Sequence, residues 1–234
     1  MKLKKLIQDL ALGELQGTPL VETSSFQIQE KFLPTLIQVI NRSLEHFYSV
    51  FPLQQGQVLI KLMNGVSHYY LDDAHAMTNP DSTAIKYIMD TDAYPFPNDV
   101  LQITGVSTLE GCQLAIDDAY SAYGVLLPQP DCIHVPNDLD TTMLSVVYQA
   151  AHPEIPLTEG ADSNFDVYLP KAMQSAFMAY VACLYLQNMG GNKHNDSNAF
   201  FAKYQTQMEL LKQQGFGVVS QSGTNIKPYL REWI

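Results

Sequence analysis

Hydrophobic residues recur at helical spacing near both ends of the chain. The first stretch is formed by Leu3, Leu6, Ile7 and Leu10, whose steps of three and four predict a short amphipathic helix. A longer run with the same steps spans residues 32–51 and stops at Pro52, which favours a second helix with Pro34 in its first turn. The N-terminal quarter of the chain is therefore expected to be helical.

The middle of the chain has a different pattern. Short apolar runs are separated by Pro, Gly, Asn and Asp about every 8–12 residues, a spacing typical of a small β-sandwich or barrel. The clearest signal is residues 57–71, where two β-rich runs flank Asn64-Gly65. Asn-Gly is a strong two-residue turn signal, so we expect these two runs to pair as a β-hairpin.

Helical spacing returns from Tyr168 onward. Residues 170–186 carry a broad apolar face that Met189-Gly190-Gly191 interrupts, and a last helix then runs to Gly215. We expect the helices of the two ends to pack together. The predicted contact places Leu36, Ile40, Leu44 and Phe47 against Phe177, Val181, Leu184 and Phe201.

These patterns predict an α+β fold with an inserted domain. Residues 1–56 and 168–215 form a discontinuous helical bundle, residues 57–167 form a β-rich, sandwich- or barrel-like domain, and residues 216–234 form an extended C-terminal arm.

Charge is distributed unevenly along the 234 residues. The net charge is −11, with a neutral segment at 1–60, −14 in 61–169 and +3 in 170–234. General binding of nucleic acid needs clustered Lys and Arg, so this composition argues against it. The acidic middle is either an ordinary solvated surface or a face that repels a polyanion passing nearby.

Composition also bears on the membrane and on cysteine chemistry. No apolar run approaches the roughly 20 residues that span a bilayer, so we expect no membrane association. Three cysteines without a CxxC motif argue against a disulfide scaffold or a structural zinc site and fit a reducing cytosol.

Sequence motifs for catalysis are weak. Neither GxGxxG, GxxxxGK[ST] nor GxSxG occurs. The best group of candidate metal ligands is His68, Asp72, Asp73 and His75, which would suit a metal-dependent hydrolase. These residues lack a fixed-spacing signature and equally fit an exposed polar turn. We therefore expect no catalytic residue, cofactor or resident metal, and keep the hydrolase as an alternative.

The C-terminal segment is rich in residues that anchor protein interfaces. Gly215, Gly217 and Gly223 precede it and would give it reach. The candidate partner-binding residues are Ile226, Lys227, Tyr229, Leu230, Arg231, Trp233 and Ile234. Trp, Tyr and Arg are enriched at interface hot spots, so this segment either docks into a neighbouring protein or folds back onto its own core.

Several segments together resemble the head-to-tail adaptor (connector) proteins of short-tailed bacteriophages. The strongest are Phe51-Pro52-Leu53 after the second helix, the phrase Tyr148-Gln149-Ala150-Ala151-His152-Pro153, and the aromatic tail. The others are KKLIQDLALGEL, LPTLIQVINRSLEHFYSVFPL, QVLIKLMNGVSHYYLDD, LSVVYQAAHPEIP, YLPKAMQSAFMAYVACLYLQNM and GTNIKPYLREWI. They occur in order along nearly the whole chain, and the loops at 74–99 and 117–131 lie outside the resemblance.

The resemblance implies a structural virion protein at the head–tail junction, assembled in the host cytoplasm. Copies would form a ring, expected to be dodecameric, that binds the portal protein on one side and the tail nozzle or tube on the other. Double-stranded DNA would pass through its lumen without specific binding, and the ring would serve both the retention of packaged DNA and its ejection. Another structural phage protein, such as a nozzle or tail-completion component, remains the alternative within this class.

Overall fold

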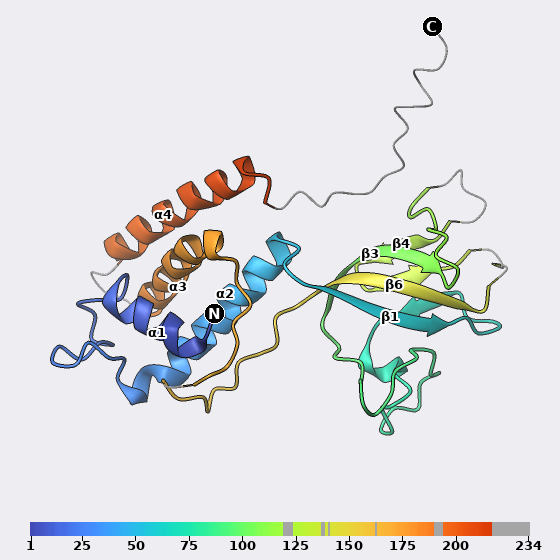
Figure 1. The fold of residues 1–234 in the computed structure, drawn as a ribbon, viewed down its shortest axis with the longest axis horizontal. Coiled ribbons are helices and arrows are strands. Elements are labelled where there is room, and N and C mark those ends of the chain that lie inside the picture. Colours follow the sequence, from blue (N-terminus) through green and yellow to red (C-terminus); the bar gives the residue numbers. More distant parts are fainter. Residues whose placement is uncertain (119–123, 137–138, 140, 162, 190–193, 217–234) are drawn as a thin grey trace, which may run out of the picture.

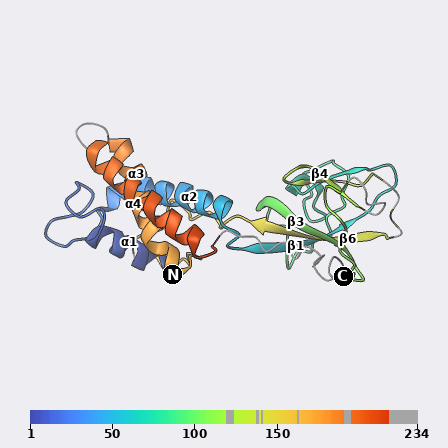
Figure 2. The ribbon, with the colours of Figure 1, turned by 90° about the horizontal axis from the view of Figure 1, so that it is seen from above.

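A computed structural model describes residues 1–118, 124–136, 139, 141–161, 163–189 and 194–216 (Figure 1). Four α-helices and two three-stranded antiparallel sheets are present in this part of the chain. The expected α+β class is confirmed, and neither sheet closes into a barrel. In both Figure 1 and Figure 2, the helices lie at one end of the molecule and the strands at the other.

The helices begin and end where local chemistry dictates. They are α1 (Leu3–Leu12), α2 (Leu33–Val50), α3 (Gln174–Met189) and α4 (His194–Gln213). Pro34 lies in the first turn of α2, where its missing N–H leaves no hydrogen bond unmade. At the other end Phe51 is extended, with φ −120° and ψ 134°, because a residue before proline is disfavoured in helical conformation.

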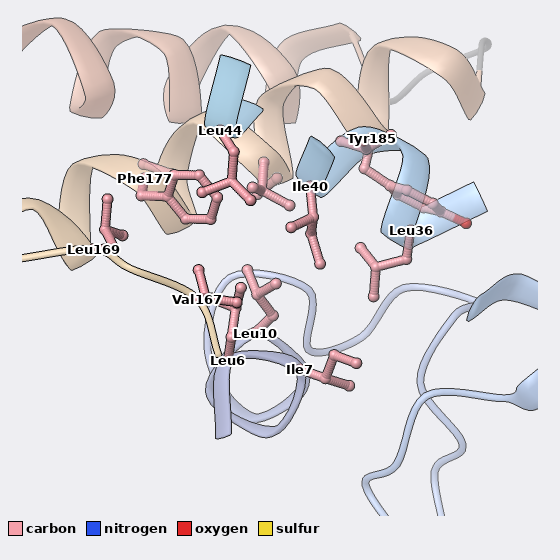
Figure 3. Packing of buried hydrophobic residues seen from close by; sticks show 14 of the residues in the cluster. Leu6, Ile7, Leu10, Leu36, Ile40, Leu44, Val167, Leu169, Phe177 and Tyr185 are labelled. Carbon is pink, nitrogen blue, oxygen red and sulfur yellow. The ribbon is translucent and has the colours of Figure 1, made fainter. Parts of the chain in front are cut away.

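One cluster of buried apolar residues joins helices from both ends of the chain. Figure 3 shows Leu36, Ile40 and Leu44 of α2 in one cluster with side chains of α1 and with Phe177 of α3. The Phe47 and Phe177 rings meet edge to face, with centroids 5.3 Å apart. The expectation for Phe201 is wrong, since it is 40% exposed: α4 contacts the cluster through Tyr204, Met208 and Leu211, and Phe201 lies at the edge of that stripe.

The larger sheet has the strand order β1-β6-β3, formed by β1 (Gln55–Lys61), β6 (Met143–Ala150) and β3 (Val100–Thr108). The smaller has the order β2-β5-β4, formed by β2 (His68–Tyr70), β5 (Cys132–His134) and β4 (Leu126–Gln129). The predicted hairpin at 57–71 is therefore wrong. The Asn64-Gly65 turn does form, with Gly65 at φ 81°, but the chain crosses there to the other sheet and β1 pairs with β6 instead.

The strands enclose a second cluster of buried apolar residues. Both sheets contribute to it, Ile60 and Val146 from the larger and Tyr69 and Ile133 from the smaller. Its buried members lie between residues 58 and 150, whereas those of the helical cluster lie between 3 and 51 and between 155 and 211. The exact domain boundaries drawn from sequence stay a prediction.

Candidate assembly surfaces and the junction between the two clusters

The two clusters are joined where α2 ends and β6 passes it. Gln149 of β6 is 5% exposed, and its side-chain amide donates to the backbone carbonyls of Tyr48 and Phe51, the latter at 3.1 Å. The last carbonyls of a helix have no partner within the helix, and burying them unpaired is costly. Gln149 therefore caps α2 and fixes its C-terminal end against the larger sheet.

His152 forms a second contact at this junction. Its Nδ1 lies 2.6 Å from the Pro153 carbonyl, and its Nε2 accepts the Tyr168 backbone N–H at 3.2 Å. Nδ1 must therefore carry the proton and donate it, which leaves a neutral ring. Burial lowers the pKa of His152, consistent with this state. Both ring nitrogens are thus occupied by the protein backbone.

Tyr48 of α2 lies between these groups. Its ring meets the His152 ring edge to face at 5.3 Å, and its hydroxyl donates to the Tyr168 carbonyl at 2.7 Å. Burial raises the pKa of Tyr48 to about 12, so the hydroxyl remains protonated and able to donate near neutral pH. The segment that returns from the sheets to α3 is thereby held against α2.

Asn41, about two turns before Tyr48 on the same side of α2, holds the same returning segment. Its amide nitrogen donates to the Ile155 carbonyl at 2.9 Å, and its amide oxygen accepts the Ile155 N–H at 3.0 Å. On the sheet side, the Tyr148 hydroxyl donates to Asp99 at 3.0 Å, and its ring covers Gly56 on the paired strand. Side chains from both halves of the molecule thus converge on the stretch from Tyr148 to Ile155.

Sequence reasoning singled out this phrase for its resemblance and missed its structural role. The available signal was polarity: Gln149 interrupts an apolar β-run and Asn41 interrupts an apolar helix. A polar side chain at a position that should be buried usually has a hydrogen-bond partner. The polar residues Gln149 and Asn41 could therefore have indicated that buried hydrogen bonds form at these positions, but not which groups are their partners.

The candidate metal ligands lie at the other end of the strand region. His68 of β2 is exposed and stacks on His134 of the paired strand, with ring centroids 4.3 Å apart. His75 stacks instead on Tyr87 at 4.5 Å, and its Nδ1 lies 2.8 Å from the Ile85 carbonyl. The two histidines are thus engaged with different neighbours.

The two aspartates of this group also make separate contacts. An Asp72 carboxylate oxygen lies 3.9 Å from His75 Nε2, whereas the Asp73 carboxylate accepts the side-chain amide of Asn79 at 2.8 Å. Across the described part of the chain, no three His, Cys, Asp or Glu residues are grouped so that they could hold a metal ion. The structure therefore does not assemble these four residues into one ligand set.

The candidate arm residues from Ile226 to Ile234 lie outside the described residues. The described chain ends just after α4, where Gly215 has φ 84° and Phe216 donates its N–H to the Leu211 carbonyl at 3.1 Å. Phe216, the first residue of the expected arm, packs partly buried against the helical cluster. The described part of the chain thus ends at the helical end of the molecule.

Exposed apolar side chains occur on both halves of the molecule. Leu12 and Phe26 flank a groove of about 240 Å³ beside α1, and Met77, Ile85 and Tyr94 project from the segment between β2 and β3. No helix in the described ranges combines the length and hydrophobicity needed to cross a membrane. No protein-family model matches the chain, and no curated protein matches it, so its function has to be argued from this geometry and from the resemblance in its sequence.

Proposed function

We propose that the chain is a structural head-to-tail adaptor of a tailed bacteriophage, whose copies form a ring between the portal and the tail. The observation that carries the proposal is the junction at Tyr148–Pro153. This phrase is one of the three most characteristic of the resemblance, and it also couples the two halves of the molecule through Gln149 and His152. An adaptor needs such coupling because its two ends must hold two different partners in a fixed relation.

In this proposal the helices of both chain ends form one bundle, and the β-rich residues between them form a separate sandwich-like domain. The shared apolar cluster of α1–α4 and the second cluster of the strands support this division. A closed ring joins two different faces of neighbouring subunits. The exposed apolar residues on both halves provide candidates for these faces.

Charge supports the same function. The segment 61–169, which includes all the strands except β1, carries a net charge of −14. A negative surface beside a DNA channel would repel the phosphate backbone and so keep DNA from adhering during packaging and ejection. The proposed partners are therefore the portal protein, the nozzle or tube protein and other copies of the chain, with DNA passing unbound.

The test is assembly with portal-bearing heads. The intact chain should join these heads as a ring, and a chain truncated after Ser220 should stay folded and fail to join them. A matched control replaces the exposed, polar Glu209 with Ala and keeps the arm. Light scattering after gel filtration would measure the number of copies, and electron microscopy would locate the ring.

Three outcomes would contradict the proposal or its assignment of the tail. Intact chain that neither binds portal-bearing heads nor forms a ring would remove the adaptor function. Truncated chain that attaches as well as intact chain would leave the ring but show that residues 221–234 are not its docking element. Unfolding of the truncated chain, read by circular dichroism, would place the tail in the subunit core instead.

A further inference from the structure

The segment between β2 and β3 places two methionines side by side on the surface. Ala76 and Ile88 pair as a parallel bridge, and both are fully buried. Successive residues of an extended chain point to opposite sides, so Met77 and Met89 emerge together on the other side of this bridge. They are 53% and 36% exposed.

Aromatic rings continue this surface toward β2. His75 and Tyr87 precede the bridged pair by one residue and stack with centroids 4.5 Å apart, as expected for side chains on the same side as the methionines. Tyr70 stacks on His75 at 6.5 Å and is 36% exposed. We call Tyr70, His75, Met77 and Met89 the methionine surface.

The surroundings of the methionine surface are acidic. Residues 70–94 contain five aspartates and a single lysine, Lys86. The Lys86 ammonium donates to the Ala74 and Asn79 carbonyls at 2.9 and 2.8 Å, so it is directed into its own loop. An exposed apolar patch with a charged rim marks an interaction site, and methionine side chains adapt to the shape of a partner.

A segment of complementary composition lies in the same chain. Residues 217–234 lie outside the described structure and include Lys227, Tyr229, Arg231 and Trp233 at alternate positions. In an extended strand these four side chains would share one face. Cations would then meet the aspartate rim, while the aromatic rings would meet the methionine sulfurs, which make favourable contacts with aromatic rings.

We propose that the methionine surface is the docking site for residues 226–234 of a neighbouring copy of this chain. The inference rests on the proposed ring, in which a surface of one copy must receive a different surface of the next. Eighteen residues follow Phe216. At about 3.3–3.6 Å per residue they could extend roughly 60 Å, enough to leave the subunit and reach a neighbour.

The first experiment uses the fluorescence of Trp233, the only tryptophan of the chain. Its emission should shift to shorter wavelength as the concentration of intact protein rises, because docking between copies removes the indole from water. The variant Met77→Lys with Met89→Lys removes the thioethers and repels Lys227 and Arg231, so it should need at least about tenfold more protein to reach the same shift, a change of about 1.4 kcal/mol. Added salt should weaken the shift in the unmodified protein.

The matched control is Leu109→Lys with Leu157→Lys. These leucines are 52% and 48% exposed and lie outside the methionine surface, so the control adds the same charge to similarly exposed positions. It should keep nearly the concentration dependence of the unmodified protein. Circular dichroism of both variants would confirm that they are folded.

The second experiment places p-benzoylphenylalanine at position 233 of the intact chain. Illumination should give a cross-linked dimer on a denaturing gel, with the adduct at Met77, Met89 or Tyr70. An adduct at these residues within one chain would overturn docking onto a neighbour. An adduct elsewhere, no adduct, or equal behaviour of the methionine variant and the leucine control would overturn the docking site itself.

Failure of this inference and failure of the adaptor function can be told apart. If intact chain forms rings on portal-bearing heads while the cross-links map elsewhere, the adaptor function stands and the docking site is wrong. If copies cross-link through the methionine surface but never bind a portal, the docking site stands and the adaptor function is wrong.

Discussion

Replacing Gln149 with Leu tests the junction between the two apolar clusters. The leucine keeps most of the side-chain volume but removes the donor that serves the Tyr48 and Phe51 carbonyls. Each lost hydrogen bond that leaves a buried carbonyl unpaired costs about 1–3 kcal/mol. The Phe51 carbonyl keeps the Leu53 N–H at 2.8 Å, so the Tyr48 carbonyl is the one left without its donor, and we expect the free energy of unfolding to fall by about 1–3 kcal/mol.

The measurement is urea denaturation followed by circular dichroism, with Gln57→Leu as the control. Gln57 lies in the paired strand β1 and donates its amide to the Ser145 hydroxyl at 2.7 Å, but it is exposed. Its loss is compensated by water, so the control should change stability by less than about 1 kcal/mol. Hydrogen exchange should also quicken at the C-terminal turn of α2 in the Gln149 variant alone.

The reasoning would be refuted if Gln149→Leu were no more destabilising than Gln57→Leu. That result would mean that water or another group satisfies the Tyr48 carbonyl. An unchanged exchange rate at residues 48–51 with lowered stability would instead show that the amide stabilises the strand and leaves the helix end unaffected.

Four other predictions follow from single contacts. Leu44→Ala, at a fully buried site of the helical cluster, should cost about 2–5 kcal/mol in unfolding free energy, whereas exposed Leu12→Ala should cost little. Gly56→Ala should cost about 1–3 kcal/mol, since the new methyl group would meet the Tyr148 ring with its phenol oxygen 2.5 Å away; Gly105→Ala, 3.8 Å from its nearest neighbour, is the control. Burial lowers the pKa of His152 in the folded protein, so as the pH falls the unfolded chain takes up this proton at a higher pH than the folded protein does. The free energy of unfolding should therefore decrease as the pH drops below the ordinary pKa of 6.5. His152→Gln should flatten that decline in pH-dependent urea titrations, and an unchanged slope would assign it to other groups. Treatment of the intact protein with a chelator should leave assembly on portal-bearing heads unchanged, because His68, Asp72, Asp73 and His75 are not brought together as one ligand set. Tight stoichiometric metal whose removal stops assembly would contradict this.

The helices could be located from sequence because their signals are local. Apolar spacing and Pro52 place α2 within a residue or two of Leu33–Val50, and Gly215 lies just beyond the end of α4. The contact between Phe47 and Phe177 also followed, since two amphipathic helices can bury their apolar faces only against another apolar surface. The exposure of Phe201 did not follow, because small rotations of a helix decide which residues lie at the edge of its buried stripe.

Strand pairing and the junction required the tertiary structure. The sequence by itself determined that residues 57–71 are β-rich and turn at Asn64-Gly65, but not that β1 pairs with residues 143–149. Backbone hydrogen bonds in a sheet are the same for every sequence, so the partner is chosen by which side chains can be buried together over long separations. For the same reason, the pairing of Gln149 with the end of α2 and the emergence of Met77 beside Met89 became visible only when distant segments were brought together.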